Sequence, residues 1–465
     1  MDTNKQVSDT ERVTRSSRRP RCRGAAAGRG RAAVPALTVL AAAGLLGGCA
    51  ATSAGSQPAS GTVSKTATAP AASAGTGPAG TVSGAGGSSP AGPGAAAASC
   101  TSAPAGSSGS AAAPALQAVQ FTDANHGWVA GAGRILATSD GGRSWTGQYS
   151  GGAELYQVDF TDAAHGWAVG QGALLHTADG GASWTALSEP ELGGHCLAVA
   201  SVHFVSPADG YAVAAPPAAG TGSAGSTSGD PGTPASGGQL LRTTDGGATW
   251  TAVPGAPSGV QSACFGTAQD GYAGAAGRIW RTTDAGKSWA LAFTEPSASA
   301  ASQSAGDVPE LECAGQDAAW VLFLGDGTAM AHAPYLAYAT GQGGSWHGVM
   351  EETMLESALR PGLHLPEGPG SEPGPFSVIS PDSAVFVGYT PPANGYGAAP
   401  VDLVTGGGAT VTGDGDVAAV NEPLAAAFTS QDKGWVVGEN LKTNTFAVEA
   451  TSDAGRSWTT QYTVR

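Results

Sequence analysis

The sequence predicts an all-β protein, a seven-bladed β-propeller with four-stranded antiparallel blades. Three observations predict it. An eight-residue box, T-x-D-x-G-x-[ST]-W, occurs five times. Neighbouring boxes lie 39 residues apart in two places, from Trp145 to Trp184 and from Trp250 to Trp289. Each complete unit contains four short strand-like segments bounded by turn residues. A repeat of about 40 residues with four strands is typical of a propeller blade.

Residues 1–48 read as a bacterial lipoprotein signal peptide. They hold nine Lys or Arg against three Asp or Glu, and the apolar run AAVPALTVLAAAGLL follows at 32–46. This run is shorter than the ~20 residues that span a membrane. Leu46-Gly47-Gly48-Cys49 resembles a lipobox, which predicts lipidation of Cys49 and an extracytoplasmic protein anchored to the cell membrane. A plain secretory signal is the alternative.

Residues 49–115 are predicted to be a disordered linker. They consist mostly of Ala, Gly, Ser, Thr and Pro. Such a composition buries too little apolar surface to fold. A flexible tether of this length has a mean reach of about 45 Å.

Seven units are predicted between residues 116 and 465. The second unit has the clearest strands, Leu155–Phe160, Gly166–Gly170, Ala173–Thr177 and Ser183–Leu187. The fifth and sixth units depart from the box, with Gly341 and Gly406 in the Asp position. The predicted limits of the units are about 116–150, 154–188, 196–254, 259–294, 308–350, 374–413 and 421–465.

The Asp and Trp of each box are predicted to be structural. An Asp-Gly pair between two strands supplies the positive φ of a tight hairpin, and the carboxylate accepts N–H groups of its own turn. The Trp can pack over that turn and against the neighbouring blade. Each box lies on a different blade, so the carboxylates cannot converge on one metal ion. The residues are Asp140, Trp145, Asp179, Trp184, Asp245, Trp250, Asp284, Trp289, Asp453 and Trp458.

Three runs before the boxes carry a family resemblance: FTDANHGWVAG (Phe121–Gly131), FTDAAHGWAVG (Phe160–Gly170) and FTSQDKGWVVG (Phe428–Gly438). Together with the boxes they resemble the BNR (Asp-box) repeat propellers, and among these the photosystem II stability/assembly factor-like family. The resemblance implies the propeller fold and a non-catalytic role in binding protein partners or assisting assembly at the cell surface. We do not extend the photosynthetic role of that family to this chain.

Composition and motifs limit the other function classes. After residue 48 the chain holds 12 Lys or Arg against 33 Asp or Glu, which disfavours nucleic acid as a partner. Sialidases share the Asp box but need an arginine triad, which is not visible here. No motif predicts a metal or a cofactor. The alternative function is a glycan-binding or glycoside hydrolase (sialidase-like) propeller, with carboxylates such as Asp307, Glu310 and Glu312.

Two smaller sets complete the predicted sites. His176, Arg242 and Arg281 occupy one register of the third strand, where they form either a binding patch or hydrogen bonds between blades. The cysteines after Cys49 are Cys100, Cys196, Cys264 and Cys313, an even number that suggests disulfides in an exported protein. Cys264 and Cys313 begin inner-strand segments of adjacent units, which favours a bond between them.

Overall fold

A computed structural model describes residues 115–192, 195–216, 237–296, 308–325, 333, 335–341, 344–352, 365–391 and 397–465. The predicted signal peptide, Cys49 and nearly all of the predicted linker lie outside these residues. Among the described residues, no helix has the length and apolar character needed to cross a bilayer.

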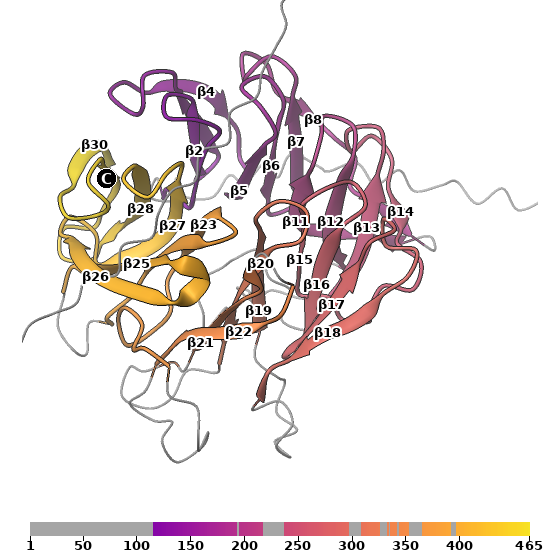
Figure 1. Ribbon diagram of the computed structural model, residues 1–465. Coiled ribbons are helices and arrows are strands. Elements are labelled where there is room, and N and C mark those ends of the chain that lie inside the picture. The colour runs from indigo at the N-terminus through magenta and orange to yellow at the C-terminus, as the bar shows by residue number, and fades with distance from the viewer. Residues whose placement is uncertain are drawn as a thin grey trace, which may run out of the picture. The chain divides into compact units, whose positions relative to one another are not determined.

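Seven four-stranded antiparallel sheets form the blades of a propeller (Figure 1). Blade 1 holds β1 (Ala118–Phe121), β2 (Gly127–Gly131), β3 (Arg134–Thr138) and β4 (Thr146–Ser150). Blade 2 holds β5 (Leu155–Phe160), β6 (Gly166–Gly170), β7 (Ala173–Thr177) and β8 (Thr185–Ala186). A small hairpin, β9 (Glu191–Leu192) and β10 (His195–Cys196), leads to blade 3, with β11 (Ala198–Phe204), β12 (Gly210–Ala215), β13 (Gln239–Thr243) and β14 (Thr251–Ala252).

The remaining four blades follow the same order. Blade 4 holds β15 (Ser262–Phe265), β16 (Gly271–Ala275), β17 (Arg278–Thr282) and β18 (Ala290–Thr294). Blade 5 holds β19 (Val308–Cys313), β20 (Ala319–Leu324), β21 (Tyr335–Ala339) and β22 (His347–Glu351). Blade 6 holds β23 (Phe376–Ser380), β24 (Ser383–Val387), β25 (Ala399–Thr405), the 3₁₀ turn η4 (Gly406–Gly408) and β26 (Thr410–Val417). Blade 7 holds β27 (Glu422–Phe428), β28 (Gly434–Asn440), β29 (Thr445–Thr451) and β30 (Thr459–Val464).

The predicted fold and the number of blades are confirmed. Three of the four strands predicted for the second unit have the observed bounds, and the fourth, β8, is shorter than its predicted span. The sixth unit, which rested mainly on spacing, forms a complete sheet.

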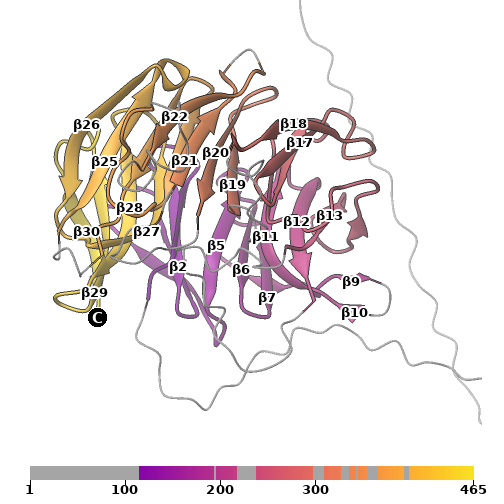
Figure 2. The ribbon, with the colours of Figure 1, turned by 90° about the horizontal axis from the view of Figure 1, so that it is seen from below.

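The ring closes between complete blades, without exchange of a strand. The first blade packs against the last (Figures 1 and 2), and residues of β1, β2, β27, β28 and β29 share one apolar cluster. Phe121 stacks on Trp435 across this junction, with ring centroids 3.4 Å apart. We call the junction of blades 7 and 1 the seam.

A repeated aromatic contact explains the F…GW pattern of the sequence. In blade 2 the last residue of the inner strand, Phe160, covers Gly166 at the start of β6, and a Cβ there would lie 2.3 Å from the ring. The opposite face of the Phe160 ring stacks on Trp128 of blade 1 at 3.6 Å. Glycine is therefore required to let the ring lie flat. The same Phe–Gly apposition recurs in blades 1, 3, 4 and 7.

The two faces of the ring carry different connections. Antiparallel order places the first-to-second and third-to-fourth turns of every blade at one face, here called the turn face. None of these turns is longer than the seven residues of a box turn such as 139–145. The longer connections, 216–238, 295–307, 325–334, 352–375 and 388–398, all start and end at the opposite face. The turn face is thus the compact, repeated face.

Candidate binding site

Each box builds its turn through one buried threonine and one aspartate that is exposed or half-buried. In blade 2 the Thr177 hydroxyl accepts the N–H groups of Asp179 (3.3 Å) and Gly181 (2.8 Å) and donates to Asp179. The Asp179 carboxylate also accepts the N–H (2.8 Å) and hydroxyl (2.6 Å) of Ser183. The other four intact boxes repeat these bonds.

These bonds account for the ionisation of the box aspartates. The Ser144 and Ser183 side chains, followed by the same residues' N–H groups, lower the pKa of Asp140 and Asp179 to about 2. The pKa values of Asp245, Asp284 and Asp453 are lowered for the same reason. Each carboxylate accepts its hydrogen bonds from residues of its own turn. Among the described residues no group of three or more His, Cys, Asp or Glu side chains is placed to hold a metal ion.

The box tryptophans pack mainly within their own blade. Trp184 meets the ring of Phe160 edge-on, with centroids 5.9 Å apart, and the same geometry recurs in the other four boxed blades. Trp184 also borders the apolar cluster between blades 1 and 2, as predicted. In blade 5 the ring partner differs, because Trp346 packs edge-on against Tyr272 of blade 4.

His176, Arg242 and Arg281 lie across from aromatic residues of the second strand. Arg242 is 5.8 Å from the Tyr211 ring and pairs with Asp209 at 3.0 Å, within blade 3. Arg281 is 5.7 Å from the Tyr272 ring and pairs with Asp317 of blade 5.

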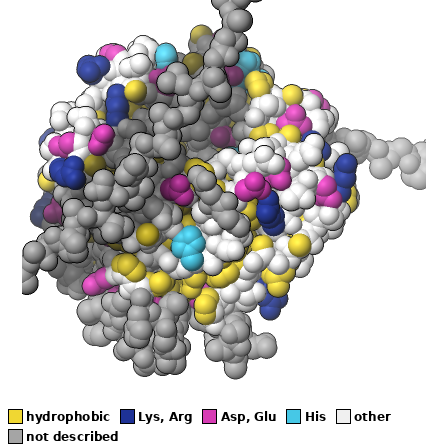
Figure 3. Space-filling view, viewed as in Figure 1, with side chains coloured by type: hydrophobic (Ala, Val, Ile, Leu, Met, Phe, Trp, Pro, Cys, Tyr) yellow, Lys and Arg dark blue, Asp and Glu magenta, His cyan; other side chains and the backbone are white. Residues whose placement is uncertain are grey.

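His176 packs beside Trp167, with ring centroids 5.1 Å apart, and burial lowers its pKa. In the described part of the chain no hydrogen bond or ion pair joins any two of these three residues. In the view of Figure 3 the Lys and Arg side chains are likewise dispersed.

The sequence did not reveal a set of side-chain contacts between the inner strands of neighbouring blades. We call each of these contacts a tie. The residue before the inner-strand Phe reaches the main chain of the next blade. The Gln120 amide accepts the Phe160 N–H and donates to the Phe160 carbonyl. Asp159 accepts the N–H of Phe204 at 2.6 Å. His203 contacts the Phe265 carbonyl at 2.7 Å through Nε2. These side chains satisfy groups at the strand edge that would otherwise stay unpaired.

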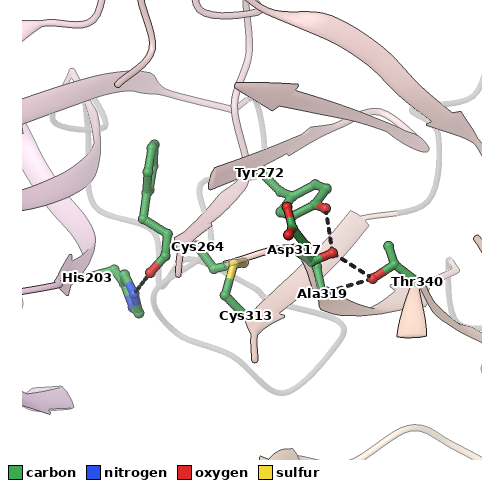
Figure 4. Close-up of a disulfide and its surroundings, with 8 residues drawn as sticks. His203, Cys264, Tyr272, Cys313, Asp317, Ala319 and Thr340 are labelled. Carbon is green, nitrogen blue, oxygen red and sulfur yellow. Dashed lines mark hydrogen bonds between the residues drawn. A yellow bond between two sulfur atoms is a disulfide. The ribbon is translucent and has the colours of Figure 1, made fainter. Parts of the chain in front are cut away.

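Cys264 and Cys313 make the corresponding tie between blades 4 and 5, and this one is covalent (Figure 4). The disulfide predicted between them is present. The expectation that both begin their strands was wrong, since Cys313 ends β19 and takes the position that Phe has in other blades. Ala319 accordingly replaces the glycine opposite. Cys196 is also disulfide-bonded.

Carboxyl and hydroxyl groups complete the ties around blade 6. Glu312 accepts the Val378 N–H at 2.7 Å, and burial raises the pKa of this carboxyl to about 7. The Ser377 hydroxyl accepts the Phe428 N–H at 2.9 Å. Among the carboxylates considered for hydrolysis, Glu312 is therefore a contact between blades. Glu310 lies in the same strand, β19, and Asp307 lies outside the described residues.

A groove of about 570 Å³ opens on the turn face where blades 6, 7 and 1 meet. Its lining comes from the end of β23, the Phe428–Lys433 turn and the Phe121–Ala124 turn. Blade 6 has Ala384 where the five blades with intact boxes carry Trp or Tyr, and Ser380 where those blades carry Phe. The groove therefore lies beside the blade in which the repeat is most degraded.

Comparisons with known proteins agree with this architecture. Residues 110–208 match the family model described as photosynthesis system II assembly factor YCF48. The matched residues run from just before blade 1 to the turn after β11 of blade 3. The family resemblance inferred from the sequence is thereby confirmed, while no curated protein matches the chain.

Several solved structures resemble the chain at low sequence identity. A xyloglucanase of the GH74 class from Xanthomonas campestris is 15% identical, with a TM-score of 0.50, 76% of this chain covered and 55% of that chain. A structure of YCF48 bound to a D1 peptide is 17% identical, with a TM-score of 0.45, 70% of this chain covered and 91% of that chain. YCF48 from Cyanidioschyzon merolae is 14% identical, with a TM-score of 0.43, 70% of this chain covered and 93% of that chain.

Proposed function

We propose that the chain is an exported, lipid-anchored, non-catalytic propeller that binds protein partners or assists assembly at the cell surface. The groove on the turn face carries this proposal. It is open, it joins three blades, and it lies on a rigid frame of short hydrogen-bonded turns. The match of residues 110–208 to an assembly-factor family supports the same role.

The state of the polar side chains favours binding over catalysis. The box carboxylates are saturated by their own turns, Arg242 and Arg281 are ion-paired, and Glu312 holds two blades together. General acid–base chemistry needs a titratable group within reach of a substrate. The groups named above are used to maintain the fold instead.

Site-specific crosslinking in intact cells tests the partner role. A photoreactive phenylalanine replaces Ser430 at the rim of the groove in the full chain, and Lys442, in the β28–β29 turn of the opposite face, serves as the control position. We expect a discrete crosslinked product from position 430 and much less from position 442. Absence of a product from position 430 and from further turn-face positions such as Arg143 and Ala182 would reject the proposal, as would turnover of xyloglucan or sialosides by the purified chain.

The anchor needs a separate experiment because Cys49 lies outside the described residues. Cys49→Ala is expected to move the protein from the membrane fraction to the soluble extracytoplasmic fraction. Unchanged fractionation would reject lipidation at this residue without affecting the partner role.

A further inference from the structure

The seam lacks the inner-strand tie that the other junctions have. The position taken by Gln120, Asp159, His203, Cys264 and Glu312 is Ala427 in blade 7, as the shared register shows. An alanine side chain neither donates nor accepts a hydrogen bond. Within the described residues, no side chain of β27 hydrogen-bonds to β1, and the seam is held instead by Trp435, which stacks on Phe121, and by the Lys433 side chain.

Among the described residues, the main chain of Phe121 therefore lacks the side-chain partner that Phe160 has. The N–H and C=O of Phe160 point away from β6, as their hydrogen bonds to the Gln120 amide of blade 1 show. Phe121 has the same register with β2 that Phe160 has with β6, so its N–H and C=O are directed away from β2 as well. In the part of the chain that the structure describes, neither group has a side-chain partner, and Phe121 lines the groove.

The ammonium group of Lys433, which lines the groove, has no carboxylate partner among the described residues. Lys433 is the one Lys or Arg among the lining residues; its ammonium donates to the Ala124 carbonyl at 2.5 Å and lies 5.1 Å from the Trp435 ring. Among the described residues it forms no ion pair. The other charged lining residue, Asp123, accepts the N–H groups of Asn125 (2.7 Å) and His126 (2.9 Å) and contacts the His126 ring at 2.8 Å.

We propose that this groove binds an extended, acidic segment of a partner protein. One residue of the segment pairs its own N–H and C=O with the C=O and N–H of Phe121, in the place where the Gln120 amide serves Phe160, and a carboxylate of the segment pairs with Lys433. Main-chain pairing at a strand edge supplies affinity, and the side-chain contact supplies specificity. The inference rests on the proposed function and assigns its site and the chemistry of its partner.

Three fluorescein-labelled hexapeptides of alternating Val and Thr serve as probes, with fluorescence anisotropy of the full chain as the readout. Two differ at one central residue, Glu or Lys, and the third is the Glu peptide with alternate amides N-methylated. At low salt we expect the Glu peptide to bind at least tenfold more tightly than either of the others. Equal binding of the Glu and Lys peptides would overturn the assignment of Lys433, and equal binding of the methylated peptide would overturn main-chain pairing.

Variants of the chain locate the binding. Ala427→Gln supplies the missing amide, so the Glu peptide should bind at least tenfold more weakly to it. Ser430→Trp, at an exposed position of the rim, should weaken binding likewise if Ala427→Gln does not fold. Lys433→Gln should abolish the preference for Glu over Lys, whereas the matched control Lys442→Gln should keep it. Undiminished binding to folded Ala427→Gln or Ser430→Trp would overturn the site.

The two proposals fail in different ways. Crosslinked partners that persist in Ala427→Gln cells would keep the proposed function and reject this groove as its site. Peptide binding in the groove without any crosslinked partner would reject the proposed function in cells and keep the site.

Discussion

Blades 1–4 and 7 differ from blades 5 and 6 in what holds them to their neighbours. The first group has intact boxes and Phe–Gly appositions, and four of its junctions are aromatic stacks with centroids 3.3–3.6 Å apart. Around blades 5 and 6 the stacks give way to a disulfide, a buried carboxyl and a hydroxyl. The box and the Phe–Gly apposition thus stabilise the blades that carry them. The groove borders blade 6, which has neither.

The largest effect is expected from the covalent tie. Replacing Cys264 and Cys313 together by Ser should lower the free energy of unfolding by about 4 kcal/mol, because the bond closes a loop between residues 49 apart. Denaturant titration of both proteins measures the difference. Mutation is preferred to a reductant, since Cys196 is disulfide-bonded too. A loss below about 1 kcal/mol would show that blades 4 and 5 do not depend on the covalent bond.

A change in the Phe–Gly apposition should have the next largest effect on stability. Gly166→Ala places a Cβ against the Phe160 ring and should cost about 3 kcal/mol through overpacking. The matched control is Ala319→Gly in blade 5, where Cys313 stands opposite and the cost should stay near 1 kcal/mol. Equal costs in the two blades would contradict the distinction between them.

Loss of the buried box hydroxyl should cost less. Thr177→Ala removes one donor and leaves the N–H groups of Asp179 and Gly181 without their acceptor, for a loss of about 2 kcal/mol in denaturant titration. Thr410→Ala in blade 6, at the end of a turn without a box, is the control and should change stability by less than about 0.5 kcal/mol. Similar losses would argue that the box is dispensable.

The last effect vanishes at low pH and concerns the carboxyl between blades 5 and 6. Because the pKa of Glu312 is raised to about 7 in the fold, its contribution to stability is complete below about pH 4 and is lost as the pH rises through 7. Glu312→Gln keeps an acceptor for the Val378 N–H without the charge. It should be as stable as the wild type at pH 4 and more stable by about 3 kcal/mol at pH 8, because each unit by which the pKa is raised corresponds to about 1.4 kcal/mol. Glu367→Gln, at an exposed position, should show no such trend; a flat difference for Glu312→Gln would refute the burial of a charge.

The sequence predicted what depends on local chemistry. The Asp-Gly and Gly-Trp signals set strand bounds within a few residues, and the box predicted its own hydrogen bonds, because donors and acceptors lie within a few residues of each other. The disulfide was predicted from two cysteines in the inner strands of adjacent units, although their positions in those strands differ by one residue. The fifth unit was placed by its decayed box and the sixth mainly by spacing, since a propeller tolerates a lost box when its strands remain.

The contacts between blades were not predicted. Gln120 and Phe160 are 40 residues apart, and their pairing depends on how two sheets stack. A signal was nevertheless present: the residue before the inner-strand Phe is polar in three successive units, at Gln120, Asp159 and His203, beside apolar neighbours. Alignment of the units on Phe would also have shown that Ala427 takes the same position with a side chain that cannot form a hydrogen bond. This would have pointed to the seam, beside which the groove lies.

The apposition of Phe and Gly constrains how such a chain can change over generations. Neither residue can be replaced alone without cost, because a larger residue at the glycine collides with the ring and a smaller residue at the phenylalanine leaves a hole. Blades 5 and 6 carry both changes, Cys313 with Ala319 and Ser380 with Ser383. If the blades arose by duplication of one ancestral unit, both residues of the apposition were replaced together in these two blades. Blades 5 and 6 could then acquire surfaces that the apposition prevents in the other five.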